Sequence, residues 1–276
     1  MKVAVIGGGA AGFFSAIAVK ENFPEAEVHI LEKSSKLLAK VKVSGGGRCN
    51  VTNACDSIGE FARAYPRGST LLKRAFHEFS NHDCIQWFEE RGVPLVTQSD
   101  QCIFPKSQDS QSIIDCFLNE CKRLGIEIKT NAGISKIIPG ENTLELYFDE
   151  SHSVSYDKVI IATGGSPKRS GLEWLEKLGH AIVDPVPSLF TFNMPQEAIT
   201  KLMGIVVPYT KVRIQGTKLN SDGPLLITHW GMSGPAILKL SAFGARILSE
   251  LNYEFTIQVN WVDEQNQNLI LNEIEH

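Results

Sequence analysis

A glycine-rich turn near the N-terminus constrains the fold of this chain more than any other feature. Gly7, Gly9 and Gly12 form a Gly-x-Gly-x-x-Gly pattern directly after Lys2–Ile6, an apolar run that predicts a short buried strand. Ala10–Asn22 then predicts a helix with one apolar face. In such a turn the first glycine permits the tight bend, the second lets the backbone approach a pyrophosphate, and the third allows close packing of helix and strand.

The second predicted strand completes a βαβ unit and supplies an acid. Val28–Leu31 predicts this strand, and Glu32 follows it, twenty residues after Gly12. A carboxylate there accepts hydrogen bonds from adenosine ribose hydroxyls and disfavours a 2′-phosphate. The structural alternative is a tight β–α turn without a ligand, and the context favours a dinucleotide site. NAD and FAD both fit the motif, and its N-terminal position favours FAD.

A second glycine-rich motif lies within the polar segment 34–53, which we predict to be a long loop. Residues 44–53 read Ser-Gly-Gly-Gly-Arg-Cys-Asn-Val-Thr-Asn, so three glycines precede Arg48 and Cys49. Such a loop can form a backbone cradle with one fixed cation, which suits a pyrophosphate or the polar edge of a flavin. A flexible surface loop is the alternative. Cys49 fits either a reactive thiol or a small packing residue, and the lack of a C-x-x-C pair favours packing.

The rest of the chain predicts a mixed architecture with a change of texture near Pro185–Pro187. We expect a Rossmann-like α/β domain over residues 1–187 and a β-rich domain over 188–276. Val159–Ala162 predicts a fully buried strand. Further helices are predicted at 70–79, 82–91, 113–124, 172–178 and 236–251, and further strands at 127–130, 134–138, 144–148, 189–192, 210–214, 225–228 and 255–259.

Composition excludes several classes of protein. The net charge of −4 argues against a sequence-independent nucleic-acid binder, so no nucleic-acid partner is expected. Six scattered cysteines without ligand spacing predict reduced thiols in the cytoplasm and no metal site. The apolar N-terminal stretch mimics a signal peptide, but its four glycines fit the dinucleotide motif better. No other apolar run is long enough to predict a membrane span.

Several segments together resemble one family. The Arg-Cys-Asn-Val-Thr-Asn run, the strand Val-Ile-Ile-Ala-Thr-Gly-Gly at 159–165 and the segment Leu-Leu-Ile-Thr-His-Trp-Gly-Met-Ser-Gly-Pro at 225–235 occur in the order typical of BaiN-like flavoproteins, also described as aminoacetone-oxidase-family FAD-binding enzymes. The resemblance implies a Rossmann-like FAD domain of glutathione-reductase-like topology with an inserted β-rich domain. By the same resemblance, FAD would be bound by Gly7, Gly9, Ala11, Gly12, Glu32, Lys33, Gly47, Arg48, Cys49, Ile134, Thr163 and Gly164.

The chain departs from the family pattern in two places. Residues 166–171 read Ser-Pro-Lys-Arg-Ser-Gly where the family has Tyr-Pro and Gly-Ser-Thr-Gly-Asp-Gly segments. Family members are also longer, so the resemblance implies that this sequence ends inside the inserted domain, without the closing C-terminal part. His229 and Trp230 fit a substrate pocket and a packing corner equally well.

The resemblance implies a flavin-dependent oxidoreductase that transfers hydride between the flavin and NAD(P)H or a small organic substrate. No catalytic acid or base follows from the pattern. Two alternatives remain at this stage. One is a non-catalytic or truncated dinucleotide-binding module, and the other is a fumarate-reductase-like flavoprotein, against which the Arg48–Asn50 segment argues.

Overall fold

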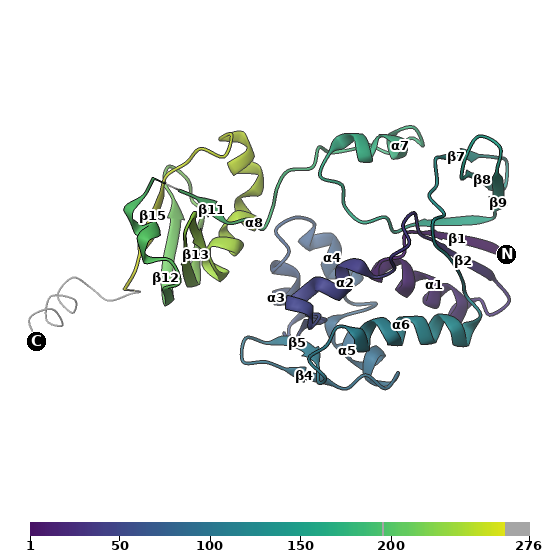
Figure 1. Ribbon diagram of the computed structural model, residues 1–276, viewed down its shortest axis with the longest axis horizontal. Helices are drawn as coiled ribbons and strands as arrows, with labels where there is room; N and C mark the ends of the chain where they lie inside the picture. The colour runs from purple at the N-terminus through teal and green to yellow at the C-terminus, as the bar shows by residue number, and fades with distance from the viewer. Residues whose placement is uncertain (195, 263–276) are drawn as a thin grey trace, which may run out of the picture. The chain divides into compact units, whose positions relative to one another are not determined.

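A computed structural model describes residues 1–194 and 196–262 of the chain. It divides into two compact units (Figure 1). Unit 1 comprises Met1–Ser166 and Leu172–Ala181, and unit 2 comprises residues 167–171 and those from Ile182 onward. The domain limits expected from the sequence, 1–187 and 188–276, stay a prediction.

A four-stranded parallel sheet forms the centre of unit 1. Its strand order is β10-β1-β2-β6, so β1 lies between the strand that follows it in the chain and one that comes much later. The βαβ unit predicted from the glycine motif is present, and the Rossmann-like α/β class is confirmed. The strands span Lys2–Ile6 (β1), Glu27–Leu31 (β2), Glu127–Lys129 (β6) and Lys158–Ile161 (β10).

Both faces of this sheet are covered, because its residues alternate between two cores. Val3 and Val5 of β1 pack in one core with residues of helices α1 and α6, while Ala4 and Ile6 pack in another with residues of an antiparallel three-stranded sheet. Unit 1 therefore has three layers (Figure 1). The covering elements are α1 (Ala10–Asn22), α6 (Gln111–Leu124), β7 (Lys136–Pro139), β8 (Leu144–Tyr147) and β9 (Ser153–Tyr156).

Two expectations for unit 1 are wrong. Segment 34–53 is not a continuous loop: it contains α2 (Ala39–Val43), the 3-10 turn η1 (Ser44–Gly47) and β3 (Thr52–Asn53). The buried side chain of Val41 anchors α2 in the core, which a polar pattern does not reveal. Strand β10 is not fully buried either, because it is an edge strand and Ile161 stays exposed.

A buried polar pair links the sheet to the layer above it. His29 of β2 is 4% exposed, and its Nδ1 lies 2.9 Å from the Tyr156 hydroxyl. Burial raises the pKa of Tyr156 to about 12, so its hydroxyl stays protonated and donates to Nδ1. The Nε2 of His29 lies 2.9 Å from Glu127 and 3.0 Å from Glu27. Burial, reinforced by Lys129, lowers the pKa of His29 below 6.5 although these two carboxylates oppose the shift, so the imidazole is neutral near pH 7.

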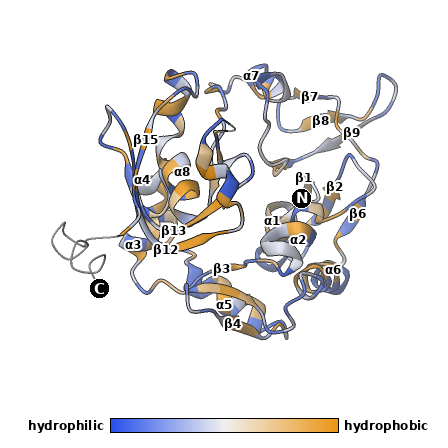
Figure 2. Ribbon diagram, turned by 60° about the vertical axis from the view of Figure 1, so that its left-hand side comes forward, coloured by the Kyte–Doolittle hydropathy of each residue, from blue (hydrophilic) through white to orange (hydrophobic). Residues whose placement is uncertain are grey.

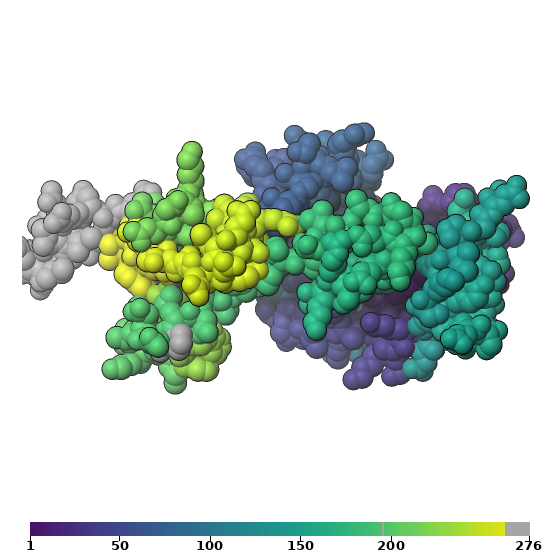
Figure 3. All heavy atoms as spheres, turned by 90° about the horizontal axis from the view of Figure 1, so that it is seen from above, coloured from purple at the N-terminus to yellow at the C-terminus, as the bar shows by residue number. Residues whose placement is uncertain are grey.

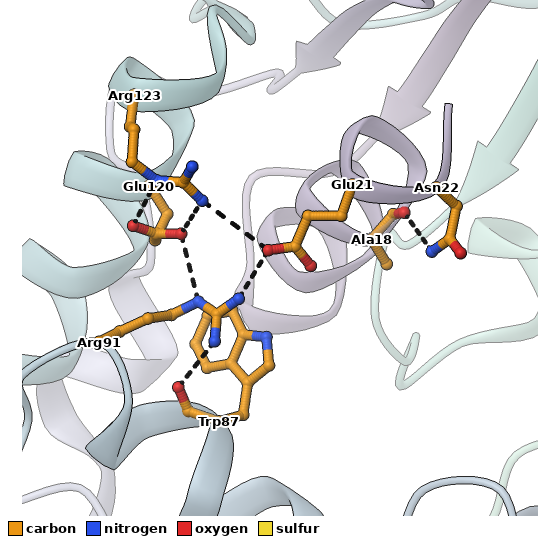
Figure 4. A network of polar contacts seen from close by, with 7 residues as sticks. All are labelled: Ala18, Glu21, Asn22, Trp87, Arg91, Glu120 and Arg123. Carbon is orange, nitrogen blue, oxygen red and sulfur yellow. Dashed lines mark hydrogen bonds and ion pairs between the residues drawn. The ribbon is translucent and has the colours of Figure 1, made fainter. Parts of the chain in front are cut away.

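Helices at the border of unit 1 are joined by a charged network (Figure 4). Arg91 donates to Glu21 of α1 at 2.6 Å and to Glu120 of α6 at 3.2 Å, and its guanidinium lies 4.0 Å from the centre of the Trp87 ring. Arg123 also pairs with Glu120. The remaining elements of this part of the chain are α3 (Ile58–Arg63), α4 (Ser69–Ala75), α5 (Asn81–Glu89), β4 (Leu95–Thr97) and β5 (Cys102–Pro105). The segment carrying α3 and α4 projects from the unit (blue in Figure 3), and α4 buries no residue.

Unit 2 is an antiparallel sheet with one long helix on its face. The strand order is β11-β14-β13-β12-β15, and α8 (Pro235–Glu250) packs on β13 and β12. Apolar residues along β12 and β13 (orange in Figure 2) form its core with α8. The predicted strand at 189–192 is wrong for most of its length, since β11 covers only Phe192–Asn193. The other strands are β12 (Val206–Ile214), β13 (Asn220–Thr228), β14 (Gly231–Ser233) and β15 (Ile257–Asn260).

An open cavity of about 690 Å³ lies in unit 2, with Phe190, Phe192, Phe255 and Trp261 among its lining residues.

The short helix α7 (Glu173–Glu176) belongs to unit 1. No helix of the described residues has the length and apolar character needed to cross a bilayer.

Candidate dinucleotide-binding site

The turn after β1 has the geometry that its three glycines predict. The N–H of Gly7 donates to the carbonyl of Leu31 at 2.8 Å, and its φ of +116° is one that other residues rarely adopt. A Cβ on Gly12 would lie 1.9 Å from the Gly7 carbonyl oxygen, so helix α1 starts in direct contact with the turn. At Gly9, which caps α1, a Cβ would meet no atom within 4 Å.

Gly12 is therefore a packing position, whereas Gly9 lies on an open surface. The first N–H groups of α1 have no partner within the helix and, with the helix dipole, attract an anion. Ala11 lies exposed in this first turn. A backbone surface that is open at Gly9 and tightly packed at Gly12 fits the pyrophosphate of a dinucleotide.

Glu32 is fixed at the end of β2 by three hydrogen bonds. Its Oε2 accepts from the Gly8 N–H at 2.8 Å, and its Oε1 accepts from the N–H and the hydroxyl of Ser34, both at 2.8 Å. Burial alone would raise the pKa of Glu32, but these hydrogen bonds outweigh it and hold the pKa below the ordinary value. Glu32 is therefore ionised. Its hydrogen bond with Gly8 also stabilises the glycine turn, a role that the motif did not predict.

Lys33 lies against the segment that leads to Ile134, because the chain after β6 returns to the end of β2. The N–H of Ala132 donates to the carbonyl of Glu32 at 2.8 Å, and a Cβ on Gly133 would lie 3.2 Å from the Cβ of Lys33. Ile134 is half-buried against the core of the antiparallel layer. Lys33 and the segment that leads to Ile134 thus lie beside Glu32.

Thr163 and Gly164 lie on the other side of the turn. The N–H of Ala162 donates to the carbonyl of Ile6 at 2.8 Å, which continues the pairing of β10 with β1. A Cβ on Gly7 would lie 2.4 Å from the Ala162 carbonyl oxygen and 3.1 Å from the Cα of Thr163. The loop after β10 therefore touches the glycine turn directly, and Gly164 adopts a left-handed φ of +75°.

The second glycine motif is a tight structured turn. Gly45, Gly46 and Gly47 have φ values of +55°, +69° and +87°, which three residues with side chains would hold only under strain. Arg48 stacks on Phe104, with its guanidinium carbon 4.2 Å from the ring centre. Arg48 also donates to the Gly45 carbonyl at 3.2 Å and to the Gln108 side chain at 3.3 Å. Arg48 is thus a fixed cation at this turn.

Cys49 is a packing residue by its surroundings. Its side chain is 7% exposed and belongs to the core that also contains residues of α1. Burial raises the pKa of the Cys49 thiol, and a hydrogen bond with Ser44 only partly offsets the shift. The Cys49 backbone has a φ of +63°, so any approach to a ligand at this position would use main-chain atoms.

Residues outside the motifs hold the second turn, and sequence reasoning missed them. Ser110, at the start of α6, donates its N–H to the Gly47 carbonyl and its hydroxyl to the Lys42 carbonyl, both at 2.9 Å. These contacts span more than sixty residues, so no local pattern signals them.

Two further predictions concern other parts of the chain. His229 and Trp230 lie at the corner between β13 and β14 with their rings 4.5 Å apart, and Trp230 is partly exposed. Among residues 1–194 and 196–262, no group of three His, Cys, Asp or Glu side chains could hold a metal ion.

The sheet, the glycine turn and Glu32 together define a Rossmann-like dinucleotide-binding protein. The chain belongs to the family described as HI0933-like protein Rossmann domain, whose model matches residues 1–256. This confirms the family resemblance seen in the motifs.

Curated relatives cover most of this chain. It is 24% identical over 271 residues to a 3-dehydro-bile acid delta(4,6)-reductase of Clostridium scindens, with 95% of this chain and 65% of the relative covered. It is 29% identical over 251 residues to a ribosomal RNA dihydrouridine synthase of Escherichia coli, with 87% of this chain and 60% of the relative covered. The chain thus spans less than two thirds of the length of these relatives.

A solved structure shares the fold. An open conformation of a flavocytochrome c3 fumarate reductase superposes with a TM-score of 0.54 and 17% identity, covering 75% of this chain and 46% of the other. At this identity the likeness concerns the fold alone.

Proposed function

We propose that this protein is an FAD-dependent oxidoreductase that binds FAD noncovalently at the carboxyl end of its parallel sheet. The observation that carries the proposal is the glycine turn, where Gly9 leaves the α1 N-terminus open to a ligand while Glu32 lies fixed at the end of β2. Membership of the HI0933-like family supports it. The binding residues we propose are Gly7, Gly9, Ala11, Gly12, Glu32, Lys33, Gly47, Arg48, Cys49, Ile134, Thr163 and Gly164.

Each group of residues has a distinct task in this proposal. The N–H groups at the start of α1 bind the pyrophosphate, and Glu32 accepts hydrogen bonds from the adenosine ribose. The loop at Ile134 borders the adenine. Arg48, fixed on Phe104, supplies a positive charge near the polar edge of the flavin ring. When bound, the flavin supplies the hydride-transfer chemistry.

The proposed hydride donor is NAD(P)H or an organic substrate, and the proposed substrate is a small organic molecule. One relative is named for the reduction of a bile acid, and the other for dihydrouridine formation in ribosomal RNA. The net charge of −4 favours the small molecule over RNA, because a nucleic-acid surface requires an excess of cations. All six cysteines are free thiols, which supports the expectation of a cytoplasmic protein.

Absorption spectroscopy tests the proposal. The purified protein, mixed with FAD and passed through a desalting column, is expected to retain the visible spectrum of a flavin. Anaerobic addition of NADH or NADPH should then bleach it. A protein that stays colourless after exposure to FAD refutes the proposal. Retained FAD that no nicotinamide nucleotide reduces would refute NAD(P)H as the donor and leave an organic donor to be tested.

A further inference from the structure

We propose that Lys40 is a binding residue for the diphosphate of the dinucleotide, so that the phosphates are held between the α1 N-terminus and a lysine ammonium group. This inference rests on the proposed function, because it concerns the same ligand. Lys40 belongs to neither glycine motif, and the family resemblance did not point to it.

The segment that carries Lys40 is strongly cationic in an acidic chain. Residues 32–50 contain one acid, Glu32, and five cations, whereas the whole chain has a net charge of −4. The five cations are Lys33, Lys36, Lys40, Lys42 and Arg48. Such a local excess next to a glycine turn favours a phosphate-bearing ligand.

The backbone fixes where Lys40 can reach. The N–H of Leu38 donates to the carbonyl of Gly8 at 2.8 Å, which ties the start of α2 to the glycine turn. Val41 is buried in the core. The ammonium group of Lys40 then lies 3.4 Å from the position that a Cβ on Gly164 would occupy. Lys40 therefore spans from the β2 side of the turn to the loop after β10, across the end of β1.

Two other cations of the segment, Lys42 and Arg48, are engaged in protein contacts. Lys42 lies 3.6 Å from a carboxylate oxygen of Asp109 and donates to Gln111 at 3.1 Å. Arg48 is held by Phe104 and Gln108. By contrast, Lys40 makes no ion pair and no side-chain hydrogen bond to any residue that the structure describes, and it is exposed. Its charge is thus available to a ligand at the sheet edge.

Electrostatics favours an anion between these groups. The N-terminus of α1 carries a partial positive charge, and the ammonium group of Lys40 is a full one. These two positive groups flank the same turn and repel each other weakly, whereas a diphosphate between them would be attracted to both. The left-handed Gly164 keeps the loop after β10 free of a side chain that would compete for this space.

Binding measurements with two probes test the assignment. ADP carries the diphosphate without a flavin, and riboflavin carries the flavin ring without phosphates. Isothermal titration gives Kd for ADP, FAD and riboflavin with the wild-type chain, Lys40→Gln, Lys40→Arg and the control Lys36→Gln. Lys36 is an exposed cation of the same segment, so its variant controls for the change in net charge. Circular dichroism checks that each variant is folded.

We expect Lys40→Gln to raise Kd for ADP and FAD by about tenfold to a hundredfold, because a charge-assisted hydrogen bond is lost. Its Kd for riboflavin should equal that of the wild-type chain. Lys40→Arg should restore most of the affinity, and Lys36→Gln should change it by less than about twofold. The inference is overturned if Lys40→Gln binds ADP as tightly as the wild-type chain, or if Lys36→Gln weakens ADP to the same extent. A wild-type chain that binds ADP but not FAD refutes the proposed function while the Lys40 comparison still stands on ADP.

Discussion

Replacing Gly12 and Gly9 separately by alanine should separate folding from ligand binding. A Cβ at position 12 would lie 1.9 Å from the Gly7 carbonyl oxygen, whereas real Cβ contacts essentially never fall below 3.0 Å. Helix α1 or the turn must therefore shift by about 1 Å. Because both partners are main-chain atoms fixed by the sheet, we expect Gly12→Ala to lower the free energy of unfolding by about 3 kcal/mol, the upper end of overpacking costs.

Gly9→Ala should behave in the opposite way. Its Cβ meets no atom within 4 Å, and the φ of −95° suits alanine. The smaller entropy of the unfolded chain and the weaker N-cap preference of alanine offset each other, so stability should change by less than about 1 kcal/mol. The methyl group would nevertheless occupy the surface that the pyrophosphate approaches, and Kd for FAD should rise at least about tenfold.

Urea unfolding followed by circular dichroism measures the first effect, and titration with FAD measures the second. The reasoning is refuted if Gly12→Ala unfolds at the wild-type urea concentration, or if Gly9→Ala retains wild-type affinity for FAD. An equal loss of stability in both variants would also contradict it, because a Cβ meets a steric conflict at position 12 and none at position 9.

Three further predictions follow from the described contacts. Arg91→Met should destabilise the chain by about 2 kcal/mol, because the Arg91 side chain is only 15% exposed and its loss removes ion pairs with both Glu21 and Glu120; the Arg123 side chain is 57% exposed, so Arg123→Met should cost about 0.5 kcal/mol or less, and urea unfolding compares them. Below pH 6.5 the unfolded chain protonates His29 more readily than the folded chain does, so the free energy of unfolding should fall as the pH drops from 6.5. Unfolding curves at several pH values measure this dependence, and His29→Gln should make it weaker. Glu32→Gln should weaken FAD binding about tenfold and destabilise the turn by about 1 kcal/mol, because the amide is uncharged and offers one acceptor oxygen where Gly8 and Ser34 now use two; the same titration and unfolding assays measure both, and wild-type values in each would contradict the role of Glu32.

The first βαβ unit could be predicted from the sequence because its signals are local. An apolar β-branched run, a glycine at each position that needs a tight or close backbone, and an acid at the end of the next strand lie within about thirty residues. Helix α6 and strands β7 and β8 of the antiparallel layer could also be predicted, since their periodicity reflects burial of one face, whereas β9 was not predicted.

The second glycine motif was harder to read. Its residues indicated a ligand-facing loop. The formation of α2 and of the 3-10 turn, however, depends on the burial of Val41 and on the hydrogen bonds of Ser110, which a polar, glycine-rich sequence does not predict. Likewise, the apolar residues of β10 predicted full burial, and only the strand order showed that it is an edge strand.

The class of fold, the family and the residues of the glycine turn could be inferred from the sequence, because each depends on residue types at short, fixed spacing. The tertiary structure shows which residues far apart in the chain come into contact. It placed Lys40 beside Gly164, Ser110 against Gly47 and Tyr156 on His29, pairs that are separated by more than sixty residues. Contacts over such separations follow from how the layers pack around the sheet, and no local spacing rule contains that information.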